Sequence, residues 1–276
     1  MLRMDLHTHT HHSPDAADTV AERIARGAEL GLQIMAVTDH CEVNHFYPAA
    51  YYGEAPCEEI FHNGRQIFFG SVTETAEAQK NNPPLLLLCG AELGQIPQCP
   101  GIAKQLYNDP RLDVVIGSVH ELPGLPDFYF LDYENYDTEK LLDQYFREVL
   151  AVACSDAYDI LGHLTYALRY LPDREGYDLT PHLPVIDAIF HKLMEKDKAL
   201  ELNGSGLKAG SPYTDPDLNL LRRYFSLGGR RLSLSTDAHS TAYLAYCMDE
   251  IEQMAREIGF TELTYFRKHQ PVSIPL

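Results

Sequence analysis

Short apolar runs alternate with stretches of helical periodicity along most of the chain. The runs have the length of β-strands, and the stretches between them place apolar residues three or four positions apart, as amphipathic helices do. This alternation predicts an α/β fold in which parallel strands are joined by crossover helices. The seven candidate strands are residues 2–7, 32–38, 85–92, 113–120, 158–163, 199–203 and 231–236.

Several of the predicted helices have recognisable ends. Thr19 and Glu22 have the spacing of a capping box ahead of a helix that Gly31 ends. Pro184 stands at the first turn of a second helix, and two glycines follow a third helix at 218–227. A further helix is predicted within residues 67–80.

The chain of 276 residues is long enough to bury a large core, and no internal repeat or Gly/Ser-rich linker divides it. We therefore expect one domain over residues 1–276. Residues 41–84 form the one irregular region, an insertion that we expect to cover the site. The alternative is a packed surface segment that makes no contact with a substrate.

Composition narrows the classes of function. The net charge of -18 opposes binding to long nucleic acids, because such binding depends on Lys and Arg. No run approaches the roughly 20 apolar residues that cross a bilayer, and Asp5 and His7 do not fit a secretory signal. Six scattered cysteines without a CxxC pair indicate reduced thiols, so we expect a cytoplasmic protein without structural disulfides.

Histidine and carboxylate residues stand at the ends of nearly all candidate strands. In a barrel of parallel strands, the carboxyl ends converge on one face, where active sites are built. We therefore expect these side chains to meet. They are His7, His9, Asp39, His40, Glu92, His120, His163, Asp237 and His239.

The spacing of these residues favours a metal site. Strand side chains alternate between faces, so His7 and His9 should point the same way, as should Asp237 and His239 if the strand continues that far. Imidazole with carboxylate and without thiolate favours Zn, Mn or Fe. His11 and His12 fall where the first strand gives way to a loop, and we expect them to have a structural or supporting role.

Six motifs, taken in order, resemble those of the PHP (polymerase and histidinol phosphatase) superfamily, and within it the histidinol-phosphatase branch. The resemblance covers most of the chain. The motifs are DLHTHT at 5–10, TDH at 38–40, GAE at 90–92, GSVH at 117–120, GH at 162–163 and STDAH at 235–239.

The resemblance implies a distorted seven-stranded (β/α)7 TIM-like barrel, the PHP fold, with three divalent metal ions. The first ion would bind His7, His9, Glu92 and Asp237, and a second would share Glu92 and add His120 and His163. A third would bind Asp15, His40 and His239, with Asp15 where some relatives carry His.

The resemblance also implies hydrolysis of L-histidinol phosphate by a metal-bridging hydroxide, with Glu92, Asp237 and His239 as catalytic residues. Arg169, Lys208 and Asn203 would bind the substrate, although Lys208 stands where we expect Arg and offers no bidentate fork. We expect Asp5 to orient a ligand histidine.

Two alternatives remain open. One is a PHP phosphoesterase that acts on another small phosphate ester or nucleotide, and the other is a noncatalytic metal-binding accessory module.

Glu42, His45 and Tyr47 are the residues we expect to contact the amine and imidazole of histidinol phosphate. The sequence leaves the oligomeric state open.

Overall fold

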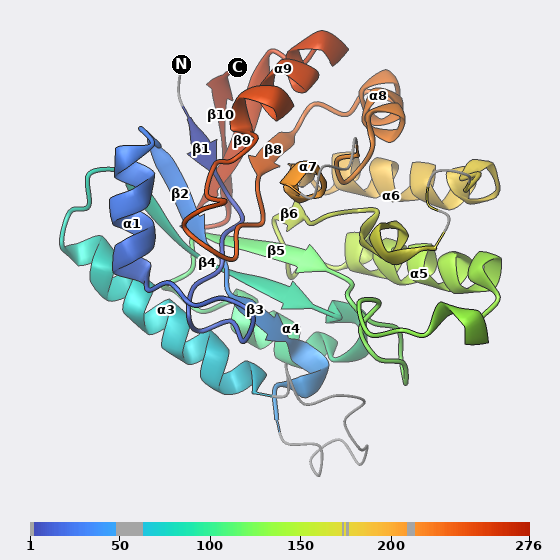
Figure 1. Cartoon of the computed structure of the whole chain (residues 1–276), viewed down its shortest axis with the longest axis horizontal. Helices are drawn as coiled ribbons and strands as arrows, with labels where there is room; N and C mark the ends of the chain where they lie inside the picture. The colour runs from blue at the N-terminus through green and yellow to red at the C-terminus, as the bar shows by residue number, and fades with distance from the viewer. Residues whose placement is uncertain (1–2, 48–62, 173, 175–176, 209–212) are drawn as a thin grey trace.

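The computed structural model describes residues 3–47, 63–172, 174, 177–208 and 213–276. Seven parallel strands form a nearly closed barrel surrounded by helices, which confirms the predicted α/β fold and strand number (Figure 1). In order around the barrel they are β1 Met4–Asp5, β2 Ile34–Val37, β4 Leu86–Gly94, β5 Val114–Ser118, β6 Ile160–Leu161, β7 Ala199–Asn203 and β8 Leu232–Ser235.

The first and last barrel strands lie next to each other. The Leu6 amide donates a hydrogen bond of 3.2 Å to the Leu234 carbonyl, and Thr8 pairs with Ala238 in a parallel bridge just beyond the strands. This contact brings the histidines that follow β1 beside the polar residues that follow β8.

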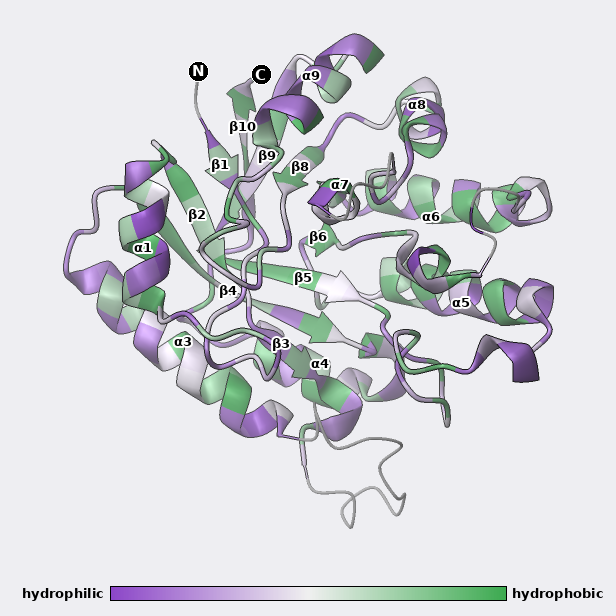
Figure 2. Cartoon of the chain, in the orientation of Figure 1, coloured by the Kyte–Doolittle hydropathy of each residue, from purple (hydrophilic) through white to green (hydrophobic). Residues whose placement is uncertain are grey.

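Helices pack around the barrel with an apolar side inward and a polar side outward (Figure 2). Thr19 and Glu22 form the expected capping box at the start of the first helix. The other helices predicted from the sequence are also present. The helices are α1 Val20–Glu29, α3 Gly64–Lys80, α4 Pro100–Tyr107, α5 Thr138–Cys154, α6 Leu183–Glu195, α7 Ser205–Lys208, α8 Leu218–Ser226 and α9 Met248–Ile258. Short 3-10 turns occur at η1 Val43–His45, η2 Ile96–Gln98, η3 Tyr133–Asn135, η4 Tyr166–Tyr170 and η5 Thr180–His182.

Two features of the fold were not predicted. A short strand, β3 His40–Glu42, pairs with β4 at the start of the region that we expected to be irregular. At the carboxyl end, β9 Glu262–Arg267 and β10 Gln270–Pro275 form an antiparallel hairpin. Its turn residues Lys268 and His269 both have positive φ, and neither is the Asn or Gly that usually marks such a turn.

The core requires very close packing between neighbouring strands. Gly90 on β4 lies so near β2 and β5 that an added Cβ would stand 2.9 Å from the Val114 carbonyl oxygen.

Among the described residues, none of the helices has the length and apolar character needed to span a membrane. The five described cysteines are free thiols, and Cys57 lies outside the described residues.

Candidate metal centre

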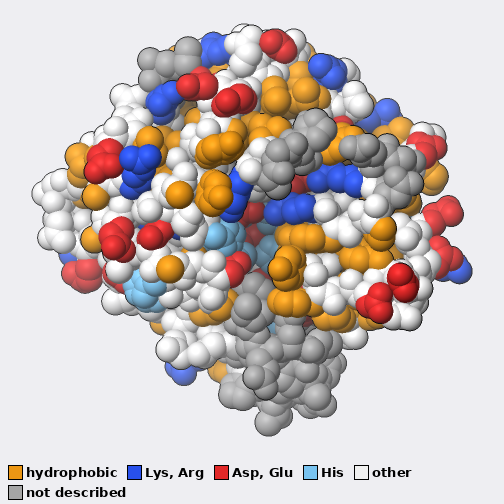
Figure 3. All heavy atoms as spheres, in the orientation of Figure 1, with side chains coloured by type: hydrophobic (Ala, Val, Ile, Leu, Met, Phe, Trp, Pro, Cys, Tyr) orange, Lys and Arg blue, Asp and Glu red, His pale blue; other side chains and the backbone are white. Residues whose placement is uncertain are grey.

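The predicted strand-end residues converge at the carboxyl ends of the barrel strands. Figure 3 shows a hollow on this face with histidine side chains in its floor and Lys and Arg side chains beside it. Six imidazoles lie here in a chain of ring contacts with centroids 4.1 to 5.7 Å apart. They belong to His7, His9, His40, His120, His163 and His239, with His9 contacting three of the others.

Glu92, on β4, lies between two pairs of histidines. Its Oε1 is 2.8 Å from Nε2 of His163 and 3.0 Å from Nε2 of His120. Its Oε2 is 3.3 Å from Nε2 of His7 and 3.7 Å from Nε2 of His9. The two oxygens of one carboxylate thus face two separate groups of nitrogen donors.

Two further carboxylates complete the cluster. Asp237 Oδ1 lies 3.2 Å from Nε2 of His9 and 3.6 Å from Nε2 of His7. Asp15 Oδ2 lies 3.0 Å from Nε2 of His239 and 3.7 Å from Nε2 of His40. Contacts among the donors also cross the three sets that the family resemblance implied, since His40 Nδ1 lies 2.7 Å from Glu92 Oε2, and the division into those sets stays a prediction.

The condition for pairing Asp237 with His239, a strand that continues that far, is not met, although both residues lie against His9. Strand β8 ends at Ser235, and Asp237 has a φ of 51°, in the left-handed region that few residues other than glycine adopt. The chain therefore turns, and Asp237 faces the histidines after β1 while His239 faces Asp15. Backbone strain of this kind often occurs at functional sites.

Carboxylates behind the cluster hold several histidine rings in place. Glu201 Oε1 lies 2.8 Å from Nδ1 of His7, and Glu42 Oε1 lies 2.8 Å from Nδ1 of His120. A partner on Nδ1 leaves Nε2 available as a donor atom for a metal. Glu201 lies inside a predicted strand, and its position on the inward face was the only sequence signal for this role.

Asp5 contacts a ligand histidine only through the backbone of His7 among the described residues, so its role in orienting a histidine ring stays a prediction. Its carboxylate accepts hydrogen bonds from the backbone amide and hydroxyl of Thr236, across the junction between β1 and β8, and from the Ala245 amide. Asp39 is likewise occupied by hydroxyl donors, among them Ser13 at 2.7 Å and Ser71 at 2.6 Å. Both aspartates therefore support the loops that carry the cluster.

Burial and mutual contact set the charges of the cluster. Burial would raise the pKa of Glu92, but His120, His7 and His40 outweigh it and hold this pKa well below its usual range. Burial would lower the pKa of His7, but Glu92, Glu201 and Asp237 raise it well above its ordinary value. Burial, together with the neighbouring His239 and His40, lowers the pKa of His9 to about 3.

The donor set fits divalent metal ions. Nε2 of His7 and Oε2 of Glu92 are buried, and neither makes a hydrogen bond among the described residues. Buried polar atoms without a hydrogen bond are rare and need an explanation, such as an ion. Several sets of three donors lie within 4.8 Å of one another, including His7, His9 and Asp237 and also His9, His40 and His239.

The predicted substrate-binding residues border the cluster. The Arg169 guanidinium pairs with Asp215 at 2.6 Å and lies 3.8 Å from Asp237 Oδ2. Asn203 is buried, and its amide nitrogen lies 3.2 Å from Glu201 Oε2 and 3.5 Å from Asp237 Oδ2. The Lys208 ammonium lies 3.8 Å from the centre of the Tyr243 ring.

The residues that we expected to contact the organic part of the substrate have other neighbours. Glu42 is buried beside His120, and His45 Nε2 lies 3.0 Å from Glu121 Oε1. The Tyr47 ring packs edge-on against Phe46. Residues 48–62 of the predicted insertion lie outside the described residues, so its role as a cover stays a prediction.

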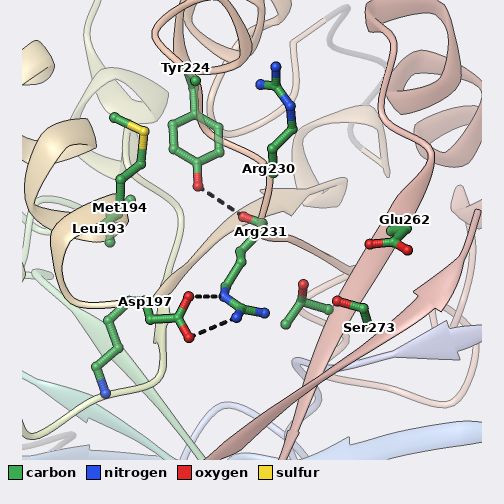
Figure 4. Close-up of a pocket in the computed structure, with 11 residues that line it drawn as sticks. Leu193, Met194, Asp197, Tyr224, Arg230, Arg231, Glu262 and Ser273 are labelled. Carbon is green, nitrogen blue, oxygen red and sulfur yellow. Dashed lines mark hydrogen bonds and ion pairs between the residues drawn. The ribbon is translucent and has the colours of Figure 1, made fainter.

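A separate cavity of about 360 Å³ lies at the opposite end of β7 and β8 (Figure 4). Arg231 forms two contacts with Asp197, at 2.5 and 2.7 Å, and Tyr224 donates a hydrogen bond to the Arg231 carbonyl. The most prominent charged groups in this cavity are thus paired with each other. It has none of the histidine donors of the cluster.

Fold and site together define the class of the protein: an α/β barrel with a histidine- and carboxylate-rich centre at the carboxyl ends of its strands. The model of the PHP domain matches residues 5–205. The chain belongs to the PHP domain family, as its motifs predicted.

Curated relatives extend the match over nearly the whole chain. The histidinol-phosphatase of Lactococcus lactis is 25% identical over 276 residues, covering 96% of this chain and 95% of the relative. A probable histidinol-phosphatase of Clostridium acetobutylicum is 25% identical, covering 85% and 86% of the two chains.

Solved structures share the fold. The histidinol phosphate phosphatase of Lactococcus lactis, complexed with zinc, L-histidinol and phosphate, matches with a TM-score of 0.75 and 22% identity over 98% of both chains. A putative histidinol phosphatase of Listeria monocytogenes matches with a TM-score of 0.76 and 16% identity, over 90% of this chain and 99% of the other.

Proposed function

We propose that this protein is a metal-dependent phosphomonoesterase that hydrolyses L-histidinol phosphate to L-histidinol and phosphate. The observation that carries the proposal is the position of Glu92, with two histidine nitrogens facing one of its carboxylate oxygens and three facing the other. The names of the curated relatives support the substrate.

Three divalent ions, of Zn, Mn or Fe, would occupy the centre. The first would be held by His7, His9, Glu92 and Asp237, and the second by Glu92, His120 and His163. Asp15, His40 and His239 would hold the third, and the contact of His40 Nδ1 with Glu92, at 2.7 Å, supports a position next to the other two. When bound, such ions supply a nucleophilic water at neutral pH and neutralise charge on the phosphoryl oxygens.

Charge explains how so acidic a protein can attract a phosphate dianion. Three divalent ions carry about six positive charges, which exceed the charge of Asp15, Glu92 and Asp237. Arg169 adds a guanidinium 3.8 Å from Asp237, at the border of the centre. Lys208 lies close enough that Asp237 influences its pKa, although burial is the main cause that lowers it.

Three polar side chains at the border of the centre would bind the phosphate or position a metal ligand. Arg169 would bind nonbridging phosphoryl oxygens, and Asp215 holds its guanidinium in one orientation. Lys208 would add a second positive charge without a fixed fork. Asn203 is buried behind Asp237, so we propose that it acts on the substrate by holding that carboxylate in place.

A second candidate is hydrolysis of another small phosphate ester or nucleotide. Lys208, in place of the expected Arg, is the observation that favours it, because a lysine recognises phosphate through charge alone. A noncatalytic metal-binding module is disfavoured, since a module without activity would be free to lose donor residues. We also propose a cytoplasmic location, in line with the free thiols of the described cysteines.

Turnover assays can separate these candidates. Protein stripped by a chelator should be inactive toward L-histidinol phosphate and should regain activity with Mn or Zn. Turnover of other esters alone would favour the second candidate. Bound metal without turnover of any ester would favour the noncatalytic module.

A further inference from the structure

His11, His12 and Glu74 form a second cluster of possible metal donors, separate from the residues around Glu92. His12 Nε2 lies 2.8 Å from Glu74 Oε2, and His11 Nε2 lies 3.6 Å from the same oxygen. All three donor atoms lie within 4.8 Å of one another. We propose that this cluster binds one additional divalent transition-metal ion of the zinc class.

The distances suit a tetrahedral ion. Zinc bonds to nitrogen and oxygen are about 2.0 to 2.2 Å long, so two ligands of a tetrahedral ion lie about 3.4 Å apart. The two contacts of Glu74 lie on either side of this value. Two imidazoles and one carboxylate are a donor set typical of zinc, with water in the remaining position.

Local structure seats both imidazoles against α3. The His12 ring packs onto Gly70, where an added Cβ would stand 2.7 Å from its Nδ1. Gly70 is one helical turn before Glu74, so the helix supplies both a flat surface for the ring and the carboxylate that faces it. The His11 amide donates a 2.8 Å hydrogen bond to the Asp18 carbonyl, and the two rings lie 4.2 Å apart.

The three side chains are only partly exposed, with 40% of His11, 19% of His12 and 36% of Glu74 accessible to solvent. An ion could therefore reach the site from solution without opening the barrel. It would fasten the loop that carries Asp15 to helix α3, and it would stabilise the folded protein increasingly as the concentration of free ion rises above its Kd.

The test is a zinc titration of the metal-loaded enzyme against a competing chromophoric chelator. Wild-type protein should bind one zinc ion per chain more than the Glu74→Gln and His12→Asn variants, or bind that ion at least about 10-fold more tightly. Gly70→Ala should lower the affinity for the same ion, because the added methyl group displaces the His12 ring. The control is Glu77→Gln, an exposed glutamate on α3 that pairs with Lys80 and should leave the ion in place.

Equal zinc stoichiometry and affinity in wild type, Glu74→Gln and His12→Asn would overturn the proposal and leave the cluster as an ion pair only. An extra ion that persists in all variants would also overturn it, because the ion would lie elsewhere. Phosphatase activity with saturating catalytic metal should be equal in all four variants and wild type, which verifies that each is folded.

Discussion

Replacement of Glu92 by glutamine should be the most damaging single substitution in the centre. The amide keeps the shape of the side chain but removes the negative charge from between His120 and His163 on one side and His7 and His9 on the other. It also replaces one oxygen acceptor by a donor that faces imidazole nitrogens. Two metal positions should therefore weaken together.

The expected magnitude follows from the contacts. Changing a group that only supports a ligand typically costs 10- to 100-fold in metal affinity or activity. Glu92 contacts both proposed metal positions directly, so we expect a loss of at least about 100-fold, which corresponds to about 2.8 kcal/mol. The Glu134→Gln variant, which changes an exposed glutamate, should keep both its metal affinity and its activity.

The assay combines metal content with turnover on the same samples. Metal per chain is measured by mass spectrometry after gel filtration, and phosphate release is measured with added metal. Glu92→Gln should lose up to two ions and nearly all activity while keeping its circular dichroism spectrum. Near-normal metal content together with near-normal turnover would refute the bridging position of Glu92.

Four more changes test other contacts of the centre and of the barrel. Glu201→Gln, which removes the negative charge beside Nδ1 of the His7 ring, should weaken metal binding by about 10- to 100-fold and should release no more than one ion; release of two ions would contradict this. Lys208→Ala should lower kcat/KM by about 10- to 100-fold, the equivalent of a charged hydrogen bond, and Lys208→Arg should preserve it; equal values for all three proteins would exclude a phosphate contact. Because carboxylates raise the pKa of His7 in the metal-free centre, metal binding should release protons and become tighter as the pH rises. Calorimetry in buffers of different ionisation enthalpy measures the protons released, and metal binding without proton release would contradict this prediction. Gly90→Ala should destabilise the fold by about 1 to 3 kcal/mol in urea unfolding, and an unchanged midpoint would mean that β2 and β5 can move apart.

The barrel could be predicted from the sequence because its strands are buried on both faces. Strands of this kind read as continuous apolar runs, such as 85–88, and most of the histidine and carboxylate residues of the centre appear where a run ends. The strand ends therefore identified Glu92, His120 and His163 before any contact was known. Their convergence follows from parallel topology alone.

Other features depend on contacts between distant segments. Glu201 binds His7 across 194 positions of the chain, and no local pattern separates it from any other inward-facing strand residue. The carboxylate of Asp5 binds Thr236, because the junction of β1 and β8 needs acceptors for its backbone amides. The turn at Asp237 is set by backbone conformation, which the strand pattern does not encode.

The most direct test of the account is phosphate release from L-histidinol phosphate, beside several other small phosphate esters, by chelator-stripped protein with and without Mn or Zn. The account predicts no turnover without metal and a strong preference for L-histidinol phosphate when metal is restored. Turnover that survives complete removal of metal, or no turnover of L-histidinol phosphate by the fully loaded protein, would contradict it.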